Sequence, residues 1–223
     1  MKKTKAVLGA TLALLLILSL SSWSANEHVI VLDDAASVEV IIPELLSGNG
    51  KAELEKKDVY LEDDEGNAAL RVEALGGDFQ RFNTNIKSLG NIEVKKNPGK
   101  GEYRFITFAW KKEGGAGIQL QLHATTNTWG HRYHAGVNVQ NWNPSIEVTP
   151  DLPKDWQIHT RDLFEDWGEM TVTGLAFSCS SLDRGFWDHL VFHQTEEDPL
   201  APQAVEPEEK LPMTWGKLKS GKF

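Results

Sequence analysis

The sequence predicts an all-β fold, a jelly-roll β-sandwich of about nine to eleven strands. Short apolar or alternating segments recur at regular spacing, turn residues separate them, and no long segment has helical periodicity. We expect the sandwich in residues 26–194, between an N-terminal signal peptide at 1–25 and a disordered C-terminal tail at 195–223. The tail is acidic and proline-rich and ends in a short basic, aromatic peptide.

The N-terminus has the pattern of a secretory signal peptide. Basic residues at positions 2–5 precede an apolar run at 6–20, and small residues follow at 21–25. We therefore expect an exported bacterial protein, secreted or periplasmic, with no membrane span after cleavage.

The net charge limits the partners of this chain, and its cysteine content limits the disulfides that it can form. The net charge of −9 argues against nucleic acid. The single cysteine, Cys179, follows an apolar run, so it predicts a buried thiol and no internal disulfide.

The first half of the chain predicts short strands. Residues 28–32 and 37–42 are β-branched, and residues 58–61 and 68–72 flank an acidic turn as a hairpin would. Residues 76–90 predict a long loop containing phenylalanine, amide and arginine side chains. Such a loop either carries function or folds over a sheet edge.

Three consecutive segments predict the centre of the fold. Residues 103–110 are apolar on both faces, whereas 118–123 and 131–142 alternate. If the three are neighbours, the polar side chains of the last two share one face. That predicted ligand-binding set is Gln119, Gln121, His123, Arg132, His134, Asn138, Gln140 and Trp142.

A face of amides and aromatic rings suits sugars, because amides bond hydroxyl groups in both directions and rings pack on sugar C–H groups. An ordinary solvated sheet face is the alternative. Trp129 and Trp187 are further candidates for exposed aromatic platforms.

The last strands are predicted at 156–161, 171–177 and 186–192, with a helical turn at 162–168 capped by Asp162. Asp188 stands in an otherwise apolar strand. A buried carboxylate needs a partner, so we expect Asp188 to bind a structural Ca²⁺ or to pair with an arginine, either Arg161 or Arg184.

Two resemblances support a carbohydrate-related fold. The segment 156–163 and the pattern Phe186, Asp188 and Leu190 resemble the closing half of carbohydrate-binding, galactose-binding-like jelly rolls. Residues 80–194 resemble a secreted domain of planctomycete-type bacterial proteins, which implies a galactose-binding-like or lectin-like sandwich but no site.

The chain also resembles alginate-lyase-like jelly rolls in part. Gln121 and His123 match one catalytic-face strand, and Ala135, Gly136 and Gln140 match another. However, Asn138 stands where that family has its catalytic tyrosine, and an amide cannot transfer a proton as tyrosine does.

We therefore expect an exported, non-catalytic module that binds a glycan or a cell-surface protein. One alternative is a polysaccharide lyase or hydrolase on the same face, with His123 or His134 as base and Tyr133 as acid. Another is a structural envelope protein that docks through its C-terminal peptide, residues 211–223.

Overall fold

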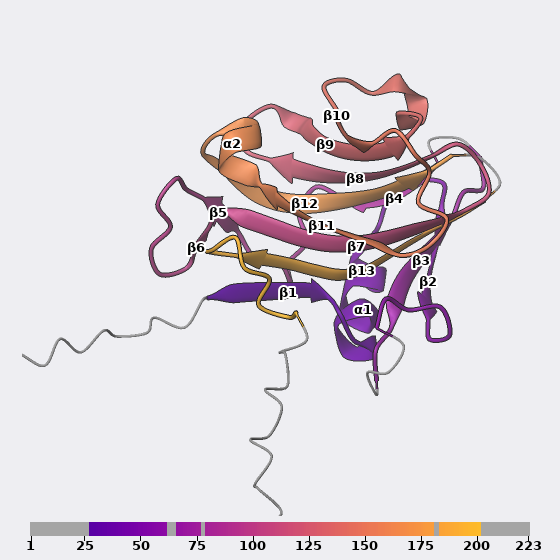
Figure 1. Ribbon diagram of the computed structural model, residues 1–223, viewed down its shortest axis with the longest axis horizontal. Coiled ribbons are helices and arrows are strands. Elements are labelled where there is room, and N and C mark those ends of the chain that lie inside the picture. Colours follow the sequence, from indigo (N-terminus) through magenta and orange to yellow (C-terminus); the bar gives the residue numbers. More distant parts are fainter. Residues whose placement is uncertain (1–26, 62–65, 77–78, 181–182, 202–223) are drawn as a thin grey trace, which may run out of the picture.

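The computed structural model describes residues 27–61, 66–76, 79–180 and 183–201, which form a sandwich of two β-sheets (Figure 1). The predicted all-β sandwich is confirmed. The described residues form thirteen strands rather than the nine to eleven expected. The predicted signal peptide and the tail from 202 onward lie outside the described residues. No helix in the described ranges is long and apolar enough to cross a membrane.

The first sheet, called the β7 sheet, has six strands in the order β11-β7-β13-β3-β2, with β1 also paired to β13. All its pairs are antiparallel. Its strands are β1 (His28–Leu32), β2 (Lys51–Glu55), β3 (Ala69–Glu73), β7 (Phe105–Glu113), β11 (Gln157–Asp162) and β13 (Arg184–His193).

The second sheet, called the β8 sheet, has seven strands in the order β10-β9-β8-β12-β5-β6, with β4 also paired to β12. The pairs β9–β10 and β5–β6 are parallel. Its strands are β4 (Gln80–Asn83), β5 (Ile92–Val94), β6 (Glu102–Tyr103), β8 (Gly117–Ala124), β9 (Thr128–Gly136), β10 (Ile146–Thr149) and β12 (Met170–Cys179).

The core lies between the sheets and is rich in aromatic rings. Phe108 of β7 stacks on Tyr133 of β9 with ring centroids 5.7 Å apart. Phe177 of β12 meets Trp187 of β13 edge to face at 5.4 Å. Each such pair spans the two sheets and adds about 0.5–1.5 kcal/mol to the free energy gained from burial. Cys179 is buried and free, as its sequence context predicts.

The three central strands are not all neighbours. β8 and β9 pair with each other, but β7 lies in the opposite sheet, between β11 and β13. The two apolar faces of β7 suit its position between two other strands of the sheet. The chain leaves β7 through a turn in which Gly114 and Gly115 both have φ of 61°. Two successive left-handed residues at this turn favour glycine and lead the chain across to β8.

A helix replaces the strand expected at 37–42. It is α1 (Ala35–Ile41), followed by the 3-10 turn η1 (Ile42–Glu44). Asp34 and Ser37 form a reciprocal capping box, with Oδ1 of Asp34 accepting from the Ser37 amide at 2.7 Å. Val38 and Ile41, three residues apart, are both buried. Capping and this helical spacing therefore outweigh the β-propensity of the branched side chains.

Two further local predictions are corrected by long-range pairing. β3 pairs with β2 at 51–55, and residues 58–61 form no strand. β4 lies within the predicted loop 76–90, because it pairs with β12.

The helical turn predicted at 162–168 is confirmed as α2 (Leu163–Trp167). Oδ1 of Asp162 accepts from the Phe164 amide at 3.1 Å, as an N-cap does.

Candidate functional site

A pocket lies on the outer face of the β8 sheet. Ile118, Leu120 and Leu122 point from β8 into the core, so the residues between them point away from it. The pocket has a volume of about 220 Å³. It is lined by Gln80, Phe82, Gln121, Trp129, Arg132 and Trp142, and we call it the sheet-face pocket.

Strand register explains why these residues meet. Ala176 of β12 lies opposite Phe82 of β4 on one side and opposite Gln121 of β8 on the other. Gln121 in turn lies opposite Arg132 of β9. Directly opposed residues share a face, so these four form one row across four strands. Because the Ala176 side chain is short, the surface at Ala176 lies lower than at the larger side chains on either side of it.

Gln121 is the centre of the polar network in the pocket. Its Nε2 donates to Oε1 of Gln80 at 3.0 Å and to Oγ of Ser178 at 2.7 Å. Its Oε1 accepts from Nε of Arg132 at 2.8 Å. Both N–H groups of the amide are therefore engaged. Gln121 is only 2% exposed, so its role is to position its neighbours rather than to present a free amide.

Arg132 is the only cationic side chain that lines the pocket. Besides the contact to Gln121, its Nη1 donates to the carbonyl of Pro144 at 3.3 Å. No ion pair in the described part of the chain includes Arg132. Burial lowers the pKa of its guanidinium, although a group with so high a pKa stays charged at neutral pH.

Three partly exposed aromatic side chains surround these polar groups. Trp129 meets Phe82 edge to face at 5.6 Å and meets His123 at 5.0 Å. Trp142 lines the pocket from the connection between β9 and β10. His123 does not line the pocket: its Nδ1 shares a hydrogen bond of 2.8 Å with Oγ1 of Thr173, and it supports Trp129.

Three of the predicted ligand-binding residues instead hold the connection that carries Trp142. Gln119 donates from Nε2 to Oδ1 of Asn138 at 3.2 Å and to Oγ of Ser145 at 3.3 Å. His134 shares a hydrogen bond of 2.8 Å with Ser145, and Asn138 donates to the Trp142 carbonyl at 2.9 Å. Burial lowers the pKa of His134. This network folds the connection back over the sheet.

Gln140 is placed outside the pocket. β9 ends at Gly136 with φ of 65°, six residues before the predicted strand end. Gln140 then lies in the 3-10 turn η2 (Val139–Asn141), exposed and with φ of 57°. Of the eight predicted residues, Gln121, Arg132 and Trp142 thus line the pocket.

Sequence reasoning missed Gln80 and Phe82 as pocket residues. Both come from β4, inside the segment expected to be a loop. The aromatic and amide side chains of that segment were a usable signal, but their position depends on pairing with β12, about a hundred residues later. Trp129 was singled out as a platform, and it does line the pocket. Trp187 was singled out as well, but that prediction is wrong, because Trp187 is fully buried in the core against Phe177.

The arrangement offers no tyrosine to the histidines of this face. Tyr133 points to the core side of β9, where it is fully buried. Its hydroxyl donates to Oδ2 of Asp166 at 2.6 Å, and Arg161 pairs with the same carboxylate at 2.7 Å. Burial raises the pKa of Tyr133 well above its ordinary value. The sheet therefore separates Tyr133 from His123 and His134.

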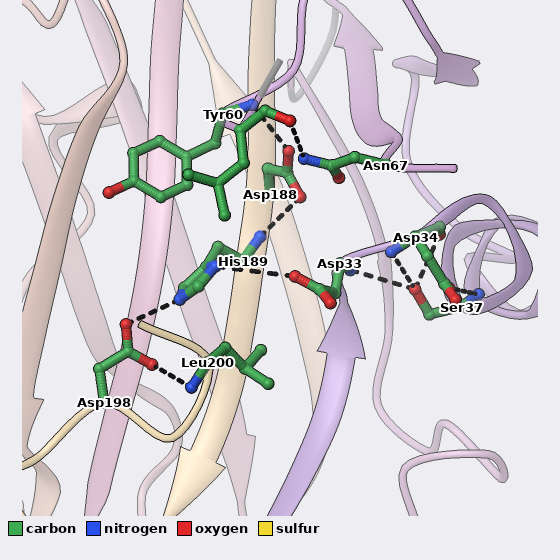
Figure 2. Close-up of polar contacts among 10 residues, drawn as sticks. Asp33, Asp34, Ser37, Tyr60, Asn67, Asp188, His189, Asp198 and Leu200 are labelled. Atoms are coloured by element: carbon green, nitrogen blue, oxygen red, sulfur yellow. Dashed lines mark hydrogen bonds and ion pairs between the residues drawn. The ribbon is translucent and has the colours of Figure 1, made fainter. Parts of the chain in front are cut away.

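Asp188 belongs to a separate buried polar cluster in the β7 sheet (Figure 2). Its carboxylate accepts from the backbone amides of Tyr60 at 2.9 Å and of His189 at 2.7 Å. His189 lies between two other acids: Nε2 shares a hydrogen bond of 2.8 Å with Asp198, and Nδ1 is 3.6 Å from Asp33. Burial raises the pKa of Asp188 to about 6.

Among the described residues, Asp188 does not pair with an arginine. Arg161 pairs with Asp166, and Arg184 pairs with Glu113. In the part of the chain that is described, no three His, Cys, Asp or Glu side chains are grouped so as to hold a metal ion. Two backbone amides satisfy Asp188 instead, and a structural Ca²⁺ stays an expectation from the sequence alone.

No known protein family matches this sequence. No curated protein matches it either. The resemblances to planctomycete-type secreted domains and to alginate-lyase-like jelly rolls therefore stay predictions.

Among solved structures, the chain is similar to a family 29 carbohydrate-binding module, at 11% identity and a TM-score of 0.42 over 79% of this chain and 99% of that one. It is also similar to a family 61 module in complex with β-1,4-galactotriose, at 14% identity and a TM-score of 0.33 over 66% and 86% of the two chains. A family 11 module from Clostridium thermocellum matches at 11% identity and a TM-score of 0.33 over 67% and 86%. Likenesses at these scores say nothing about what this chain binds.

Proposed function

We propose that this protein is an exported, non-catalytic module that binds a glycan in the sheet-face pocket. The observation that carries the proposal is the convergence of Phe82, Trp129 and Trp142 around Arg132 and two amides. These residues come from separate strands and a folded-back connection, and all three rings stay partly exposed. Rings with an open face and fixed polar neighbours suit the two kinds of surface that a sugar ring presents.

The shape of the site favours binding over catalysis. The pocket is smaller than the roughly 300–1,000 Å³ typical of enclosed ligand sites, so one or a few sugar units at the surface fit it best. Neither His123 nor His134 lines it, and Tyr133 lies on the other side of the sheet. A mechanism that uses His123 or His134 as base and Tyr133 as acid therefore does not fit this pocket.

A glycan array with the purified mature protein tests the proposal. We expect saturable binding to at least one glycan and at least tenfold weaker binding in Trp142→Ala. Trp156→Ala is the matched control, because Trp156 is also partly exposed but contacts Asp58 in the other half of the molecule.

Mass spectrometry of the bound glycan after overnight incubation should show no shorter product. If the folded protein binds no glycan on the array, the glycan proposal is wrong. Unchanged binding in Trp142→Ala would show that the glycan binds outside this pocket. Release of a shorter product would show that the protein is an enzyme.

A further inference from the structure

Arg132 differs from the other arginines of known placement. Arg71, Arg104, Arg161 and Arg184 each pair with a carboxylate. Arg81 has no such pair, but it donates from both Nη atoms to the backbone carbonyls of Leu45 and Gly48. Arg132 alone combines partial burial, a position in a cavity and no acidic partner among the described residues.

The guanidinium of Arg132 is also held in a set orientation. The contacts to Gln121 and to the Pro144 carbonyl use two of its five N–H groups. The remaining N–H groups belong to the two Nη atoms, the pair that forms parallel hydrogen bonds with a carboxylate or sulfate.

A partly buried cation without a counter-charge has lost part of its hydration without regaining it from an ion pair. An anionic ligand group supplies that missing interaction. A hydroxyl group supplies less, because hydrogen bonds with one charged partner are weaker than those with two.

We propose that the sheet-face pocket selects glycans that carry an anionic group, a uronate carboxylate or a sulfate ester, which pairs with Arg132 while Trp142 or Trp129 packs on the sugar ring. This inference rests on the proposed function and names its ligand class. It places the charge of the ligand beside Nη of Arg132 and the sugar between the aromatic side chains.

The net charge of −9 opposes any anionic ligand at long range. The acid nearest in register, Glu147 of β10, is exposed and lies 3.8 Å from His134 rather than beside Arg132. Attraction at the pocket is therefore local, and salt at physiological strength screens the long-range repulsion.

The test starts from an array that holds uronate-containing, sulfated and neutral oligosaccharides. Calorimetry then compares the best-bound anionic oligosaccharide with its masked form, the methyl ester for a uronate or the desulfated sugar for a sulfate. We expect the charged form to bind about ten- to a hundredfold more tightly, as hydrogen bonds between charged groups predict.

Arg132→Gln should abolish this preference, so that the charged and the masked form bind this variant with affinities within about threefold of each other. Arg184→Gln is the matched control, since Arg184 pairs with Glu113 in the other sheet. Arg132→Lys keeps a charge but not the planar fork, so it should restore only part of the preference. Unfolding by urea shows whether each variant is folded.

Each outcome is decisive. Binding of neutral glycans only, or equal affinity for charged and masked forms in the wild-type protein, overturns the inference and leaves the proposed function standing. Absence of binding to every glycan overturns both. The wild-type comparison decides the inference even if Arg132→Gln does not fold.

Discussion

Nε of Arg132 donates to Oε1 of Gln121 at 2.8 Å across the β8–β9 pair. Because Gln121 is itself tied to Gln80 and Ser178, one amide links three strands, β4, β8 and β12, to the guanidinium on a fourth. The orientation of Arg132 is thus set by the protein. A ligand that meets a group already oriented loses less conformational entropy on binding.

Gln121→Glu should remove the preference for anionic glycans. The substitution keeps the side-chain size, removes the N–H donors to Gln80 and Ser178, and places a carboxylate beside Arg132, so the guanidinium acquires an internal partner. We expect affinity for an anionic glycan to fall at least about tenfold and affinity for its masked form to change less than about threefold, measured by calorimetry. Gln121→Met adds no charge but also loses the bond to Arg132, so it shows how much of the change comes from the loss of that bond. A glutamate variant that keeps the preference would show that Arg132 does not bind the anion.

Asn138→Ala should weaken glycan binding through the connection that carries Trp142. The change removes the bond to the Trp142 carbonyl and one of the two acceptors of the buried Gln119 amide. Loss of a hydrogen bond at a buried group costs about 1–3 kcal/mol of the free energy of unfolding, which urea unfolding would measure. Val137→Ala is the control, since Val137 is exposed next to it. Unchanged affinity would mean that the connection stays in place without Asn138.

Tyr133→Phe should lower stability without affecting binding. The hydroxyl that is lost donates to Asp166, which keeps its ion pair with Arg161. The expected cost is about 1–2 kcal/mol, seen in urea unfolding. Glycan affinity should stay within twofold or so, because Tyr133 points to the core side of the sheet. A stable variant that no longer binds the glycan would show that the Tyr133 hydroxyl takes part in function.

Asp188→Asn should be better tolerated at pH 7 than at pH 4. Burial raises the pKa of Asp188 from 3.8 to about 6, against two backbone amides that lower it. A carboxyl group with a raised pKa in the folded state destabilises that state once it ionises. This cost is therefore fully present above pH 6 and disappears as pH falls below about 4.

The size of this effect follows from the pKa of Asp188. At about 1.4 kcal/mol for each tenfold change in the dissociation constant, the shift corresponds to about 3 kcal/mol. Urea unfolding of both proteins at pH 7 and pH 4 would give the difference in unfolding free energy. That difference should move in favour of Asp188→Asn by an amount of this order as pH rises. No change with pH would show that Asp188 ionises normally in the folded protein.

Much of the fold could be read from local patterns. The alternation of 118–123 correctly assigns the two faces of β8, because the side-chain period of a strand is two wherever the strand lies. The cap at Asp162 correctly starts α2, since its hydrogen bonds lie within one turn. These features depend on neighbours in the sequence, so the sequence contains them in full.

The candidate site depended on contacts that no local pattern contains. Phe82 enters the pocket because β4 pairs with β12, and Trp142 does so because Gln119 and Asn138 fold the connection back over the sheet. β7 lies in the sheet opposite β8 and β9 because β11 and β13, both later in the chain, pair with it. Strand pairing and buried hydrogen bonds join residues far apart in sequence. The tertiary structure therefore decided which polar residues line the pocket and which hold it in place.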